Sequence, residues 1–591
     1  MENNRNYFVA IALSVFILIG WQFLYVNPKI EKDRIATEAQ QTTTADGTPA
    51  ASGQVQPTAN GAVPGAVETR DQAVAKSARV IIDTAALSGS INLTGGRFDD
   101  LKLKEYHETV DDKSPLITLF SPSDTQDGYF TELGFIGTDA TGTMPGPQTV
   151  WTLAGGDKLT ASTPVTLSYT NEKGVVFTRT ISVDEHFMFQ VTDSIKNGSA
   201  VPVSLSSYGR VTRFNQPAVA STYVLHEGFI GVIGEHGLQE VKYSKVENDV
   251  PILPGTATTG WLGITDKYWA AAIVPPQDKP YETRFAHFTD GRARFQADYK
   301  QDALTIAPGQ SADVKNMIFA GAKQVPLISG YEQTYSIPQF NLLIDWGWFW
   351  FITKPMFKLM DFFFRYFENF GVAILATTVV VKALFFPLAS KQYASMANMK
   401  KVQPKMEELK KKHGDDRMAL QQGMMALYKE EKINPIAGCW PILFQIPVFF
   451  ALYKVIYVTI EMRHAPFFGW IQDLSAPDPT SLFNLFGLLP YDVPHALMIG
   501  VWPLVMGITM FLQMRMNPTP PDPTQAMLFT WMPLVFTFML SSFPAGLVIY
   551  WAWNNTLSIA QQAFIMKRHG AKIELFDNLK GLFAKKPKPA K

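Results

Sequence analysis

The sequence predicts a multi-domain membrane protein in which an exported β-sandwich is joined to a set of membrane-spanning helices. Several apolar stretches are long enough to cross a bilayer as helices. About 250 residues between the first two of them show the pattern of short strands. Lys and Arg are concentrated in one set of loops, as in membrane proteins of fixed orientation. The chain has 591 residues and a formal net charge of zero, so its size allows several domains and its overall charge does not indicate nucleic-acid binding.

The first apolar run, 7–26, is longer than the core of a signal peptide. It follows Arg5, and no small-residue cleavage site comes after it, so we expect an uncleaved transmembrane anchor over residues 1–26. Residues 27–78 contain no aromatic residue and are rich in Ala, Thr, Gln, Gly and Pro. Such a composition cannot form a packed core and predicts a disordered linker.

Residues 79–335 have the composition of a β domain. Phe177, Ile181 and Val183 alternate with Thr and Ser, a period of two that is typical of half-buried strands. The stretch 196–199 contains Asn-Gly and predicts a turn between two such runs. Many short strands in succession predict one large β-sandwich, since an all-β domain can reach this size.

The β domain contains no recognisable catalytic motif. His226 and Glu227 begin like a zinc-protease helix, but no second His follows at the required spacing. The sequence has neither a Walker loop nor a nucleophile elbow. The single cysteine, Cys439, excludes an intramolecular disulfide and a cysteine-based zinc site. We therefore expect no enzyme activity, no cofactor and no metal site. The histidines of the domain do not form a sequence cluster, which favours core or surface positions over a carbohydrate-type site: His107, His186, His226, His236 and His287.

Residues 336–369 join the β domain to the next apolar stretch. Trp346, Trp348 and Trp350 precede Lys354 in this segment, a pattern that predicts an amphipathic helix lying in the membrane interface. A fully inserted helix is disfavoured, because Lys354 and the proline after it interrupt the apolar run.

Further apolar stretches follow, and each is expected to span the membrane. Pro544 and Gly546 predict a tight turn between the last two, whose hydropathy alone resembles that of one long helix. Together with the anchor they make six spans, which place both termini on the same side. The expected spans are 370–389 and, within 436–566, the stretches 436–460, 495–514, about 527–542 and about 545–566.

Lys and Arg set the predicted orientation. The segment 390–435, whose pattern is typical of a charged helical hairpin, and the C-terminal tail 567–591 are both strongly basic. In residues 461–494, by contrast, Arg463 is the only lysine or arginine. The hairpin, the tail and both termini are therefore predicted to be cytoplasmic, and the β domain is predicted to be exported.

One charge lies inside an otherwise apolar span. Lys382 is the only charged residue of 370–389, and Thr378 lies one helical turn before it on the same face. A charge at the centre of a bilayer costs about 2.5–3.5 kcal/mol on insertion scales and usually faces a polar cavity or a partner. The sequence therefore predicts a wet, positively charged groove. The alternative is that the side chain of Lys382 extends along the helix and places its ammonium in the membrane interface. For Lys454, which lies near the exported end of its span, this extension is a sufficient explanation of the charge.

Several long stretches carry a resemblance to a known family. They are DWGWFWFITKPMFKLM, FFPLASKQYASMANMKKVQPK, GDDRMALQQGMMALYKEEKINPIAGCWPILFQIPVFFALY, APFFGWIQDLSAPDP and FPAGLVIYWAWNNTLSIAQQ. They make the chain similar to the YidC membrane protein insertases, in the long form that has a large periplasmic domain. The resemblance covers nearly the whole chain, is strongest over Asp345–Arg568, and extends to the N-terminal MENNRNYFVAIAL.

The resemblance implies a fold and a site. The fold is a periplasmic β-sandwich similar to sugar-epimerase domains, followed by a core of five transmembrane helices with a cytoplasmic hairpin, in the bacterial inner membrane. Family members carry one charged groove residue, usually arginine, where this chain has Lys382. Lysine keeps the charge but lacks the bidentate fork of arginine. Other positions that match family residues are Thr378, Gln445 and Asn554 in the groove, Gly371 in the core and Trp470 in an external loop.

The resemblance also implies a function: the insertion and assisted folding of inner-membrane proteins, alone or with the Sec translocon. The implied partners are nascent membrane proteins, the Sec translocon, the lipid bilayer, and ribosomes or targeting factors bound by the basic hairpin and tail. Two other classes of protein remain as alternatives. A solute transporter or channel would need paired intramembrane charges or repeated broken helices. A membrane-anchored envelope protein that binds or cleaves carbohydrate would need clustered carboxylates and histidines.

Overall fold

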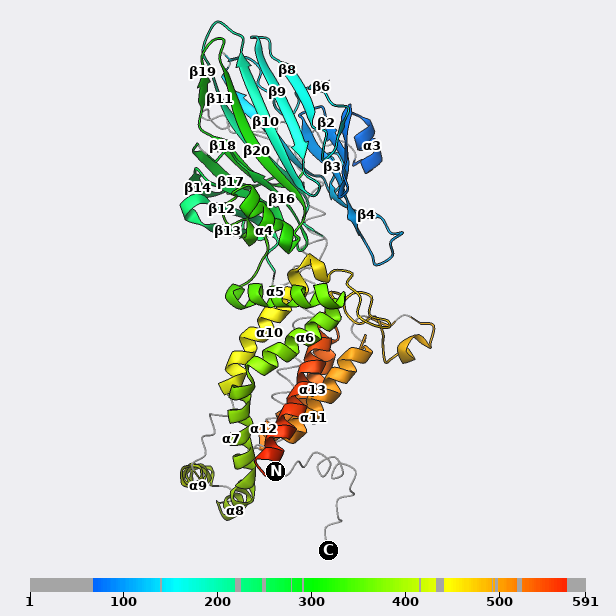
Figure 1. Ribbon diagram of the computed structural model, residues 1–591, viewed down its shortest axis with the longest axis vertical. Helices are drawn as coiled ribbons and strands as arrows, with labels where there is room; N and C mark the ends of the chain where they lie inside the picture. Colours follow the sequence, from blue (N-terminus) through cyan, green and yellow to red (C-terminus); the bar gives the residue numbers. More distant parts are fainter. Residues whose placement is uncertain are drawn as a thin grey trace. The chain divides into compact units, whose positions relative to one another are not determined.

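The structure is a computed structural model that describes residues 67–570, apart from 139–140, 218–224, 247–250, 278, 290–291, 414–415, 432–439, 492, 495–497 and 518–522 (Figure 1). The predicted anchor over 1–26, most of the predicted linker, Cys439 and the tail beyond residue 570 lie outside the described residues.

The β domain consists of two large sheets. In the described part of the chain, the first sheet has 11 strands and the second has 9. The first sheet runs in the order β14 (Ile252–Ala257), β17 (Tyr281–Phe288), β18 (Arg294–Gln301), β11 (Val203–Phe214), β5 (Tyr129–Gly137), β3 (Arg97–His107), β2 (Leu87–Asn92), β1 (Arg79–Asp83) and β7 (Lys158–Leu159), with β19 (Leu304–Ile306) paired to β11 and β4 (Leu116–Phe120) paired to β3. The second runs in the order β13 (Leu238–Lys242), β12 (Gly228–Ile233), β15 (Gly260–Thr265), β16 (Trp269–Val274), β20 (Ser311–Ala322), β10 (Met188–Asn197), β9 (Val175–Val183), β8 (Val165–Thr170) and β6 (Thr152–Gly155).

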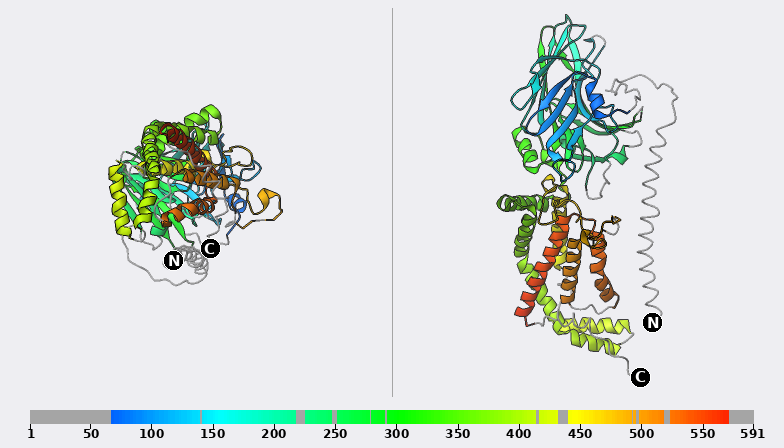
Figure 2. Two further views of the ribbon diagram at one scale, coloured as in Figure 1. Left: turned by 90° about the horizontal axis from the view of Figure 1, so that it is seen from below. Right: turned by 90° about the vertical axis from the view of Figure 1, so that its right-hand side faces the viewer.

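The two sheets pack face to face, which confirms the predicted β-sandwich (Figures 1 and 2). The hydroxyl of Tyr129 on β5 donates to the carbonyl oxygen of Ile264 on β15, at 3.3 Å, and so links the sheets directly. Along β9 the odd-numbered residues from 175 to 183 are buried and the even-numbered ones are not, as the alternation predicts. Arg179 belongs to the buried set, where its guanidinium is paired with Asp193 at 2.7 Å. Such pairing offsets the cost of burying both charges.

A predicted turn and several short helices complete the β domain. The side-chain oxygen of Asn197 accepts a hydrogen bond from the amide of Ser199 at 2.9 Å, which closes the predicted Asn-Gly turn after β10. The helical elements are α3 (Arg70–Ala75), η3 (Gly234–His236), η4 (Tyr243–Lys245), α4 (Val325–Thr334) and η5 (Phe340–Leu343).

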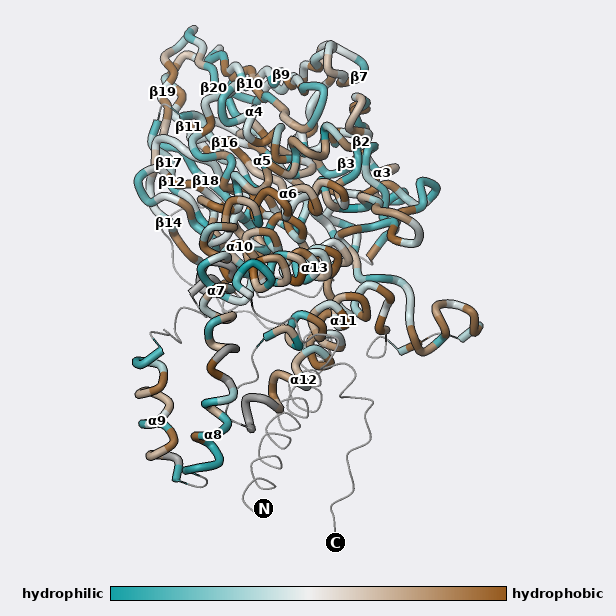
Figure 3. Tube along the Cα trace, turned by 60° about the horizontal axis from the view of Figure 1, so that its bottom comes forward, coloured by the Kyte–Doolittle hydropathy of each residue, from teal (hydrophilic) through white to brown (hydrophobic). Residues whose placement is uncertain are grey.

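The rest of the described chain consists of helices and the loops that join them. Figure 3 shows hydrophobic colour through much of α6 and α10 and hydrophilic colour along α8. The aromatic segment predicted to be an interfacial helix contains α5, which packs against α6 and α10. The helices are α5 (Trp350–Phe367), α6 (Phe370–Leu384), α7 (Phe386–Lys401), α8 (Gln403–His413), α9 (Arg417–Glu430), α10 (Trp440–Val458), η7 (Ile460–Met462), η8 (Leu485–Gly487), α11 (Val501–Met516), α12 (Pro523–Leu540) and α13 (Ala545–Arg568).

The stretch 370–389, predicted to span the membrane, is not one continuous helix. The helix breaks between α6 and α7, and the two axes differ by 67°. Pro387 explains the break, because it has no N–H to donate to the carbonyl oxygen of Ala383 and its ring crowds that carbonyl. Between Leu540 and Ala545, by contrast, the structure has the turn that Pro544 predicts.

A helix that crosses a membrane on its own must be both long and apolar. Among the described residues, no single helix is both long enough and apolar enough to cross a membrane. The bent pair Phe370–Leu384 and Phe386–Met399 meets both requirements when its two helices are counted together. Three shorter apolar helices are also present: Ile446–Val458, Val501–Met516 and Met527–Leu540.

The predicted charged hairpin contains α8 and α9, which pack side by side. Val402, Met406 and Leu427 form its small apolar core. The side chain of Asp416 accepts a hydrogen bond from the amide of Ala419 at 3.0 Å and so caps α9. Lys405 and Glu431 form an ion pair across the hairpin at 2.5 Å.

Charged residues near the end of α10 have fixed partners, and we call this group the junction: Asp345, Lys454, Glu461 and Arg463. The ammonium of Lys454 lies 2.7 Å from the carboxylate of Asp345, so simple snorkelling of Lys454 is the wrong description. The carboxylate of Glu461 accepts a hydrogen bond from the amide of Val325, at the start of α4, at 2.8 Å. Arg463 donates to the carbonyl oxygen of His107 at 2.5 Å. Glu461 and Arg463 thereby link the loop after α10 to the β domain.

Candidate functional site

Lys382 lies in the last turn of α6, immediately before the bend, and its side chain is half-buried. Its ammonium donates a hydrogen bond to the hydroxyl oxygen of Ser558 on α13 at 2.7 Å. The Ser558 hydroxyl in turn donates to the carbonyl oxygen of Asn554 at 2.7 Å. The last turn of a helix is a favourable place for a cation because the helix dipole is negative there.

Lys382 borders a cavity of about 80 Å³, which we call the Lys382 cavity. The bend creates this cavity, because it places residues of α7 beside α6 and α13. Polar side chains in its lining are hydroxyls, amides and one ammonium, and no carboxylate is among them in the described part of the chain. The lining residues are Thr378, Val381, Lys382, Phe385, Leu388, Ala389, Gln392, Tyr393, Val448, Tyr550, Asn554 and Gln561.

Hydrogen bonds between helices hold the walls of this cavity in place. The indole of Trp553 on α13 donates to the carbonyl oxygen of Leu375 on α6 at 3.2 Å. The side chain of Gln562 donates to the carbonyl oxygen of Met516, at the end of α11, at 3.3 Å. Within α6, the hydroxyl of Thr378 donates to the carbonyl oxygen of Ile374 at 2.7 Å, which satisfies a polar group that is almost fully buried.

The structure brings three of the candidate groove residues together: Thr378, Lys382 and Asn554 all line the Lys382 cavity. Gln445 lies in α10, but its side chain is outside the part that the structure describes.

Gly371 and Trp470 lie apart from the cavity. A Cβ atom on Gly371 would stand 2.0 Å from the ring of Phe467, so only glycine fits this packing. The indole of Trp470 donates to the carboxylate of Asp478 at 3.2 Å.

Sequence analysis did not single out Ser558, the hydrogen-bond partner of Lys382. A signal was present: α13 is an apolar helix in which Asn554, Ser558 and Gln561 follow one another at spacings of four and three residues. That spacing places all three on one face of the helix. Tyr393 was also missed, because a straight helix over 370–389 gives no reason to expect α7 beside α13.

One face of α12 carries large apolar side chains that no part of the described chain covers. The exposed residues are Leu528, Phe529, Trp531, Leu534, Val535, Phe538 and Met539. A contiguous apolar surface of this kind marks contact with lipid or with another apolar partner.

Chemically, the Lys382 cavity offers one cation, several neutral hydrogen-bond donors and acceptors, and apolar walls. Among the described residues, no three His, Cys, Asp or Glu side chains are close enough to hold a metal ion. The arrangement is suited to attracting and binding a short anionic or polar segment.

Comparison with known proteins identifies the family. Residues 79–359 match the family described as the YidC periplasmic domain, and residues 362–572 match the family described as the 60Kd inner membrane protein. The chain is 76% identical over 595 residues to the membrane protein insertase YidC of Rhizobium meliloti (strain 1021), and the match covers 100% of both chains. The chain belongs to the YidC family of membrane protein insertases. Identity to the YidC of Brucella suis biovar 1 (strain 1330) is 63% over 608 residues, again over 100% of both chains.

Solved structures resemble the chain more distantly. A crystal structure described as an active YidC insertase has 18% identity and a TM-score of 0.35, and the match covers 82% of this chain and 91% of that one. A galactose mutarotase related enzyme from Lactobacillus acidophilus has 9% identity and a TM-score of 0.31, with 41% of this chain and 97% of that one covered. Membership in the YidC family rests on the sequence matches, because these scores are too low to argue from.

Proposed function

We propose that this member of the insertase family inserts nascent inner-membrane proteins through the Lys382 cavity. The observation that carries the proposal is a half-buried lysine whose ammonium donates to the hydroxyl of Ser558, in a cavity that no carboxylate lines among the described residues. A charge that is not neutralised at short range keeps its attraction for an incoming anionic group. A client with a short acidic N-terminal head would therefore be drawn towards Lys382.

The energetic argument needs no nucleotide. Burying the apolar segment of a client in lipid is favourable by roughly 0.3–0.6 kcal/mol for each Leu, Ile, Phe or Val on insertion scales. The obstacle is the polar head of the client, which must leave water before the apolar segment is buried. The hydroxyls, amides and ammonium of the cavity replace part of the hydration of the head and so lower that barrier.

We infer that the helical region lies in the membrane in the predicted orientation. The apolar face of α12 supports lipid contact. Along α5, Trp350, Phe351, Phe362 and Tyr366 are exposed although they are aromatic, which is what an interfacial helix requires. The basic hairpin and tail would then lie on the cytoplasmic side, where they can meet ribosomes or targeting factors, and the Sec translocon is a second proposed partner.

The test is the insertion of a single-span client with an acidic head into vesicles that contain the purified full-length protein. We expect Lys382→Ala to lower the insertion rate and Lys382→Arg to retain it, because arginine preserves the positive charge. Lys454→Arg is the matched control, since it makes the same kind of change at a lysine that is already paired with Asp345. Insertion by Lys382→Ala at the wild-type rate would contradict the proposal.

A further inference from the structure

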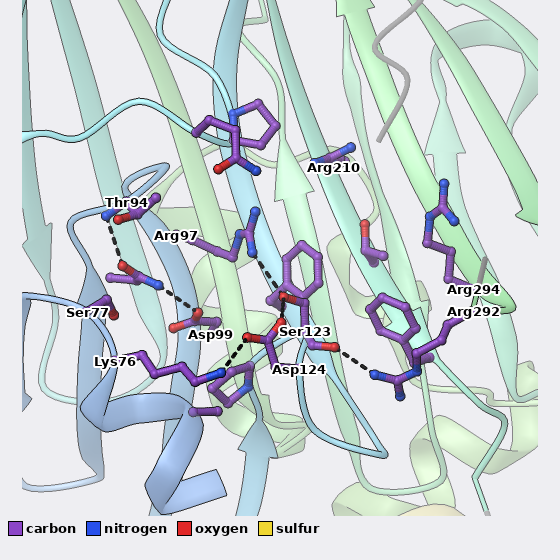
Figure 4. A pocket seen from close by; sticks show the side chains of 18 residues that line it. Lys76, Ser77, Thr94, Arg97, Asp99, Ser123, Asp124, Arg210, Arg292 and Arg294 are labelled. Carbon is purple, nitrogen blue, oxygen red and sulfur yellow. Dashed lines mark hydrogen bonds and ion pairs between the residues drawn. The ribbon is translucent and has the colours of Figure 1, made fainter. Parts of the chain in front are cut away.

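A second hollow lies in the β domain, far along the sequence from Lys382. It is a cleft of about 350 Å³ on the 11-stranded sheet, bordered by residues of β3, β5, β11 and β18, by the segment after α3 and by two loops (Figure 4). Clefts of 300–1,000 Å³ are of the size that holds small ligands. We call this hollow the arginine cleft.

Positive charge dominates the lining of the arginine cleft. Five lining side chains are cationic, namely Lys76, Arg97, Arg210, Arg292 and Arg294, and two are carboxylates, Asp99 and Asp124. Figure 4 shows Lys76 and Asp99 on one side, Arg292 and Arg294 on the other, and Arg97 between them. The sequence gives no sign of this, because the cations come from separate parts of the chain.

The nearby carboxylates do not offset this excess. Arg97 and Arg210 share one carboxylate, that of Glu132, at 3.0 and 2.7 Å. Asp99 is bound by Arg79, which lies outside the cleft lining. Lys76 pairs with Glu68, which lies outside the cleft lining, and the remaining acid of the lining, Asp124, lies 3.9 Å from Lys76. One carboxylate, that of Glu132, thus serves both Arg97 and Arg210 beneath the cleft, so this part of the wall has more positive than negative charge.

Arg292 and Arg97 also have neutral partners that hold their guanidinium groups in place. Arg292 donates to the carbonyl oxygens of Ser123, Thr125 and Gln126, at 2.8, 2.7 and 2.7 Å. Arg97 lies over the ring of Phe130 at 4.5 Å, and Arg292 lies over the ring of Phe214 at 4.6 Å. Stacking fixes the plane of a guanidinium and leaves its charge available, because an aromatic ring does not neutralise it.

A buried donor in the same wall points to a missing acceptor. Arg210 is 3% exposed, and its Nε has no hydrogen-bond partner in the part of the chain that the structure describes. An unsatisfied buried donor costs about 1–3 kcal/mol, so an acceptor that reached it would be bound favourably.

We propose that the arginine cleft binds a small organic anion through a carboxylate or phosphate group held by Arg97, Arg210 and Arg292. Guanidinium groups recognise both of these planar or multidentate acceptors, and charge-assisted hydrogen bonds are about twice as strong as neutral ones. The anion has two possible sources, a soluble anion in the compartment that holds the β domain or the headgroup of an anionic lipid. The site is separate from the Lys382 cavity and does not depend on the proposed insertion mechanism.

The experiment is isothermal titration calorimetry on the full-length protein in phosphatidylcholine nanodiscs. The probes are inorganic phosphate and D-glucuronate, with D-glucose as the neutral analogue. We expect both anions to bind and glucose not to bind. Glucose binding as tightly as glucuronate, or no binding of either anion, would overturn the proposal.

Two variants inside the cleft and one outside it locate the site. Arg97→Gln removes a guanidinium while Arg210 still pairs with Glu132, and Lys76→Gln removes a cation whose side chain is 54% exposed and therefore does not affect the core. Lys104→Gln is the matched control: Lys104 is also on the first sheet but pairs with Asp83 outside the cleft. We expect Arg97→Gln to weaken phosphate binding roughly tenfold, Lys76→Gln to weaken it less, and Lys104→Gln to leave it unchanged. Equal binding by all three variants and the wild type would overturn the proposal.

Competition separates the two sources. Soluble short-chain phosphatidylglycerol is added during the phosphate titration, with short-chain phosphatidylcholine as the control. If phosphatidylglycerol displaces phosphate and phosphatidylcholine does not, the proposal is supported and the ligand is a lipid headgroup. If phosphate binding is unchanged when phosphatidylglycerol is present, the proposal is supported and the ligand is a soluble anion.

Discussion

Two regions of the helical part each contain a lysine, and they treat its charge differently. At the junction, the ammonium of Lys454 lies 2.7 Å from the carboxylate of Asp345. In the Lys382 cavity, the ammonium of Lys382 lies 2.7 Å from the hydroxyl of Ser558, and no carboxylate is among the described lining residues. A lysine neutralised by a carboxylate contributes to the structure, whereas the lysine held by a hydroxyl is the one that we propose acts on a client. The comparison separates charges that hold the fold from a charge that can act on a client.

The largest expected effect is that of Lys382→Glu. This change replaces attraction for an acidic head by repulsion, so insertion should fall below that of Lys382→Ala. Changes at close charge pairs cost about 2–5 kcal/mol, which corresponds to a loss of roughly thirtyfold or more in rate. The measurement is the initial rate of insertion of the acidic-head client into vesicles.

The control for this variant is its folding. Thermal unfolding in detergent should show a cooperative transition for both Lys382→Glu and Lys382→Ala, so that the insertion rates are compared between folded proteins. Rates of insertion that are equal for the two variants would show that the sign of the charge is irrelevant.

At the junction, Lys454→Met should lower stability and leave insertion per folded molecule unchanged. Methionine keeps the length of the side chain and removes the charge, which leaves the largely buried carboxylate of Asp345 without its cation. We expect a loss of about 1–3 kcal/mol in the free energy of unfolding. Burial acts to raise the pKa of Asp345, but Lys454 outweighs it and the pKa lies below its ordinary value.

Adding Asp345→Asn to Lys454→Met tests the explanation. The double variant no longer buries an unpaired charge, so it should recover part of the lost stability. A double variant less stable than the sum of the two single changes would contradict the ion-pair account.

Glu461 gives the junction a pH dependence. Burial raises the pKa of Glu461 from 4.5 to about 7, against the opposing hydrogen bond from Val325. The folded protein therefore holds a proton that the unfolded chain releases at about pH 4.5. Stability contributed by this group is present at low pH, falls as the pH rises from about 4.5 to about 7, and is constant above that range.

Glu461→Gln removes this titration and keeps an oxygen that can accept the hydrogen bond from the Val325 amide. Between pH 5 and pH 7, the unfolding midpoint of the variant should therefore change less with pH than that of the wild type. The measurement is a series of thermal unfolding curves in detergent. Identical pH profiles for the two proteins would assign the pH dependence to other groups.

The smallest expected effect is that of Ser558→Ala. The hydroxyl of Ser558 positions Lys382 but does not neutralise it, so its loss should cost about 1 kcal/mol or less, roughly a fivefold fall in insertion rate at most. Thr556→Ala is the matched control, because Thr556 also donates to the carbonyl oxygen four residues earlier but does not contact Lys382. A loss for Ser558→Ala as large as that for Lys382→Ala would place the essential group on α13.

Sequence patterns predicted the β-sandwich because burial alternates along its strands with a period of two. The odd-numbered residues of β9, from Val175 to Val183, are buried as that period requires. Lys382 could be found because a single charge stands out in an apolar stretch. Patterns of this kind are local, so they can be read without knowing which segments meet.

The remaining features depend on contacts that local patterns do not specify. The bend at Pro387 was missed because hydropathy over 370–389 is continuous across it, although a proline inside a helix should have indicated it. The pairing of Lys454 with Asp345, and the five cations of the arginine cleft, join residues far apart in the sequence. Such groups can be assembled only when the path of the chain is known.

The most direct test of the central claim changes the charge of the client and of the protein together. Two clients that differ only in their heads, one acidic and one with lysines in place of the acids, are inserted by wild type and by Lys382→Glu. The account predicts that the wild type prefers the acidic head and that Lys382→Glu loses or reverses this preference. The same preference in both proteins would contradict the claim that the charge of Lys382 acts on the client.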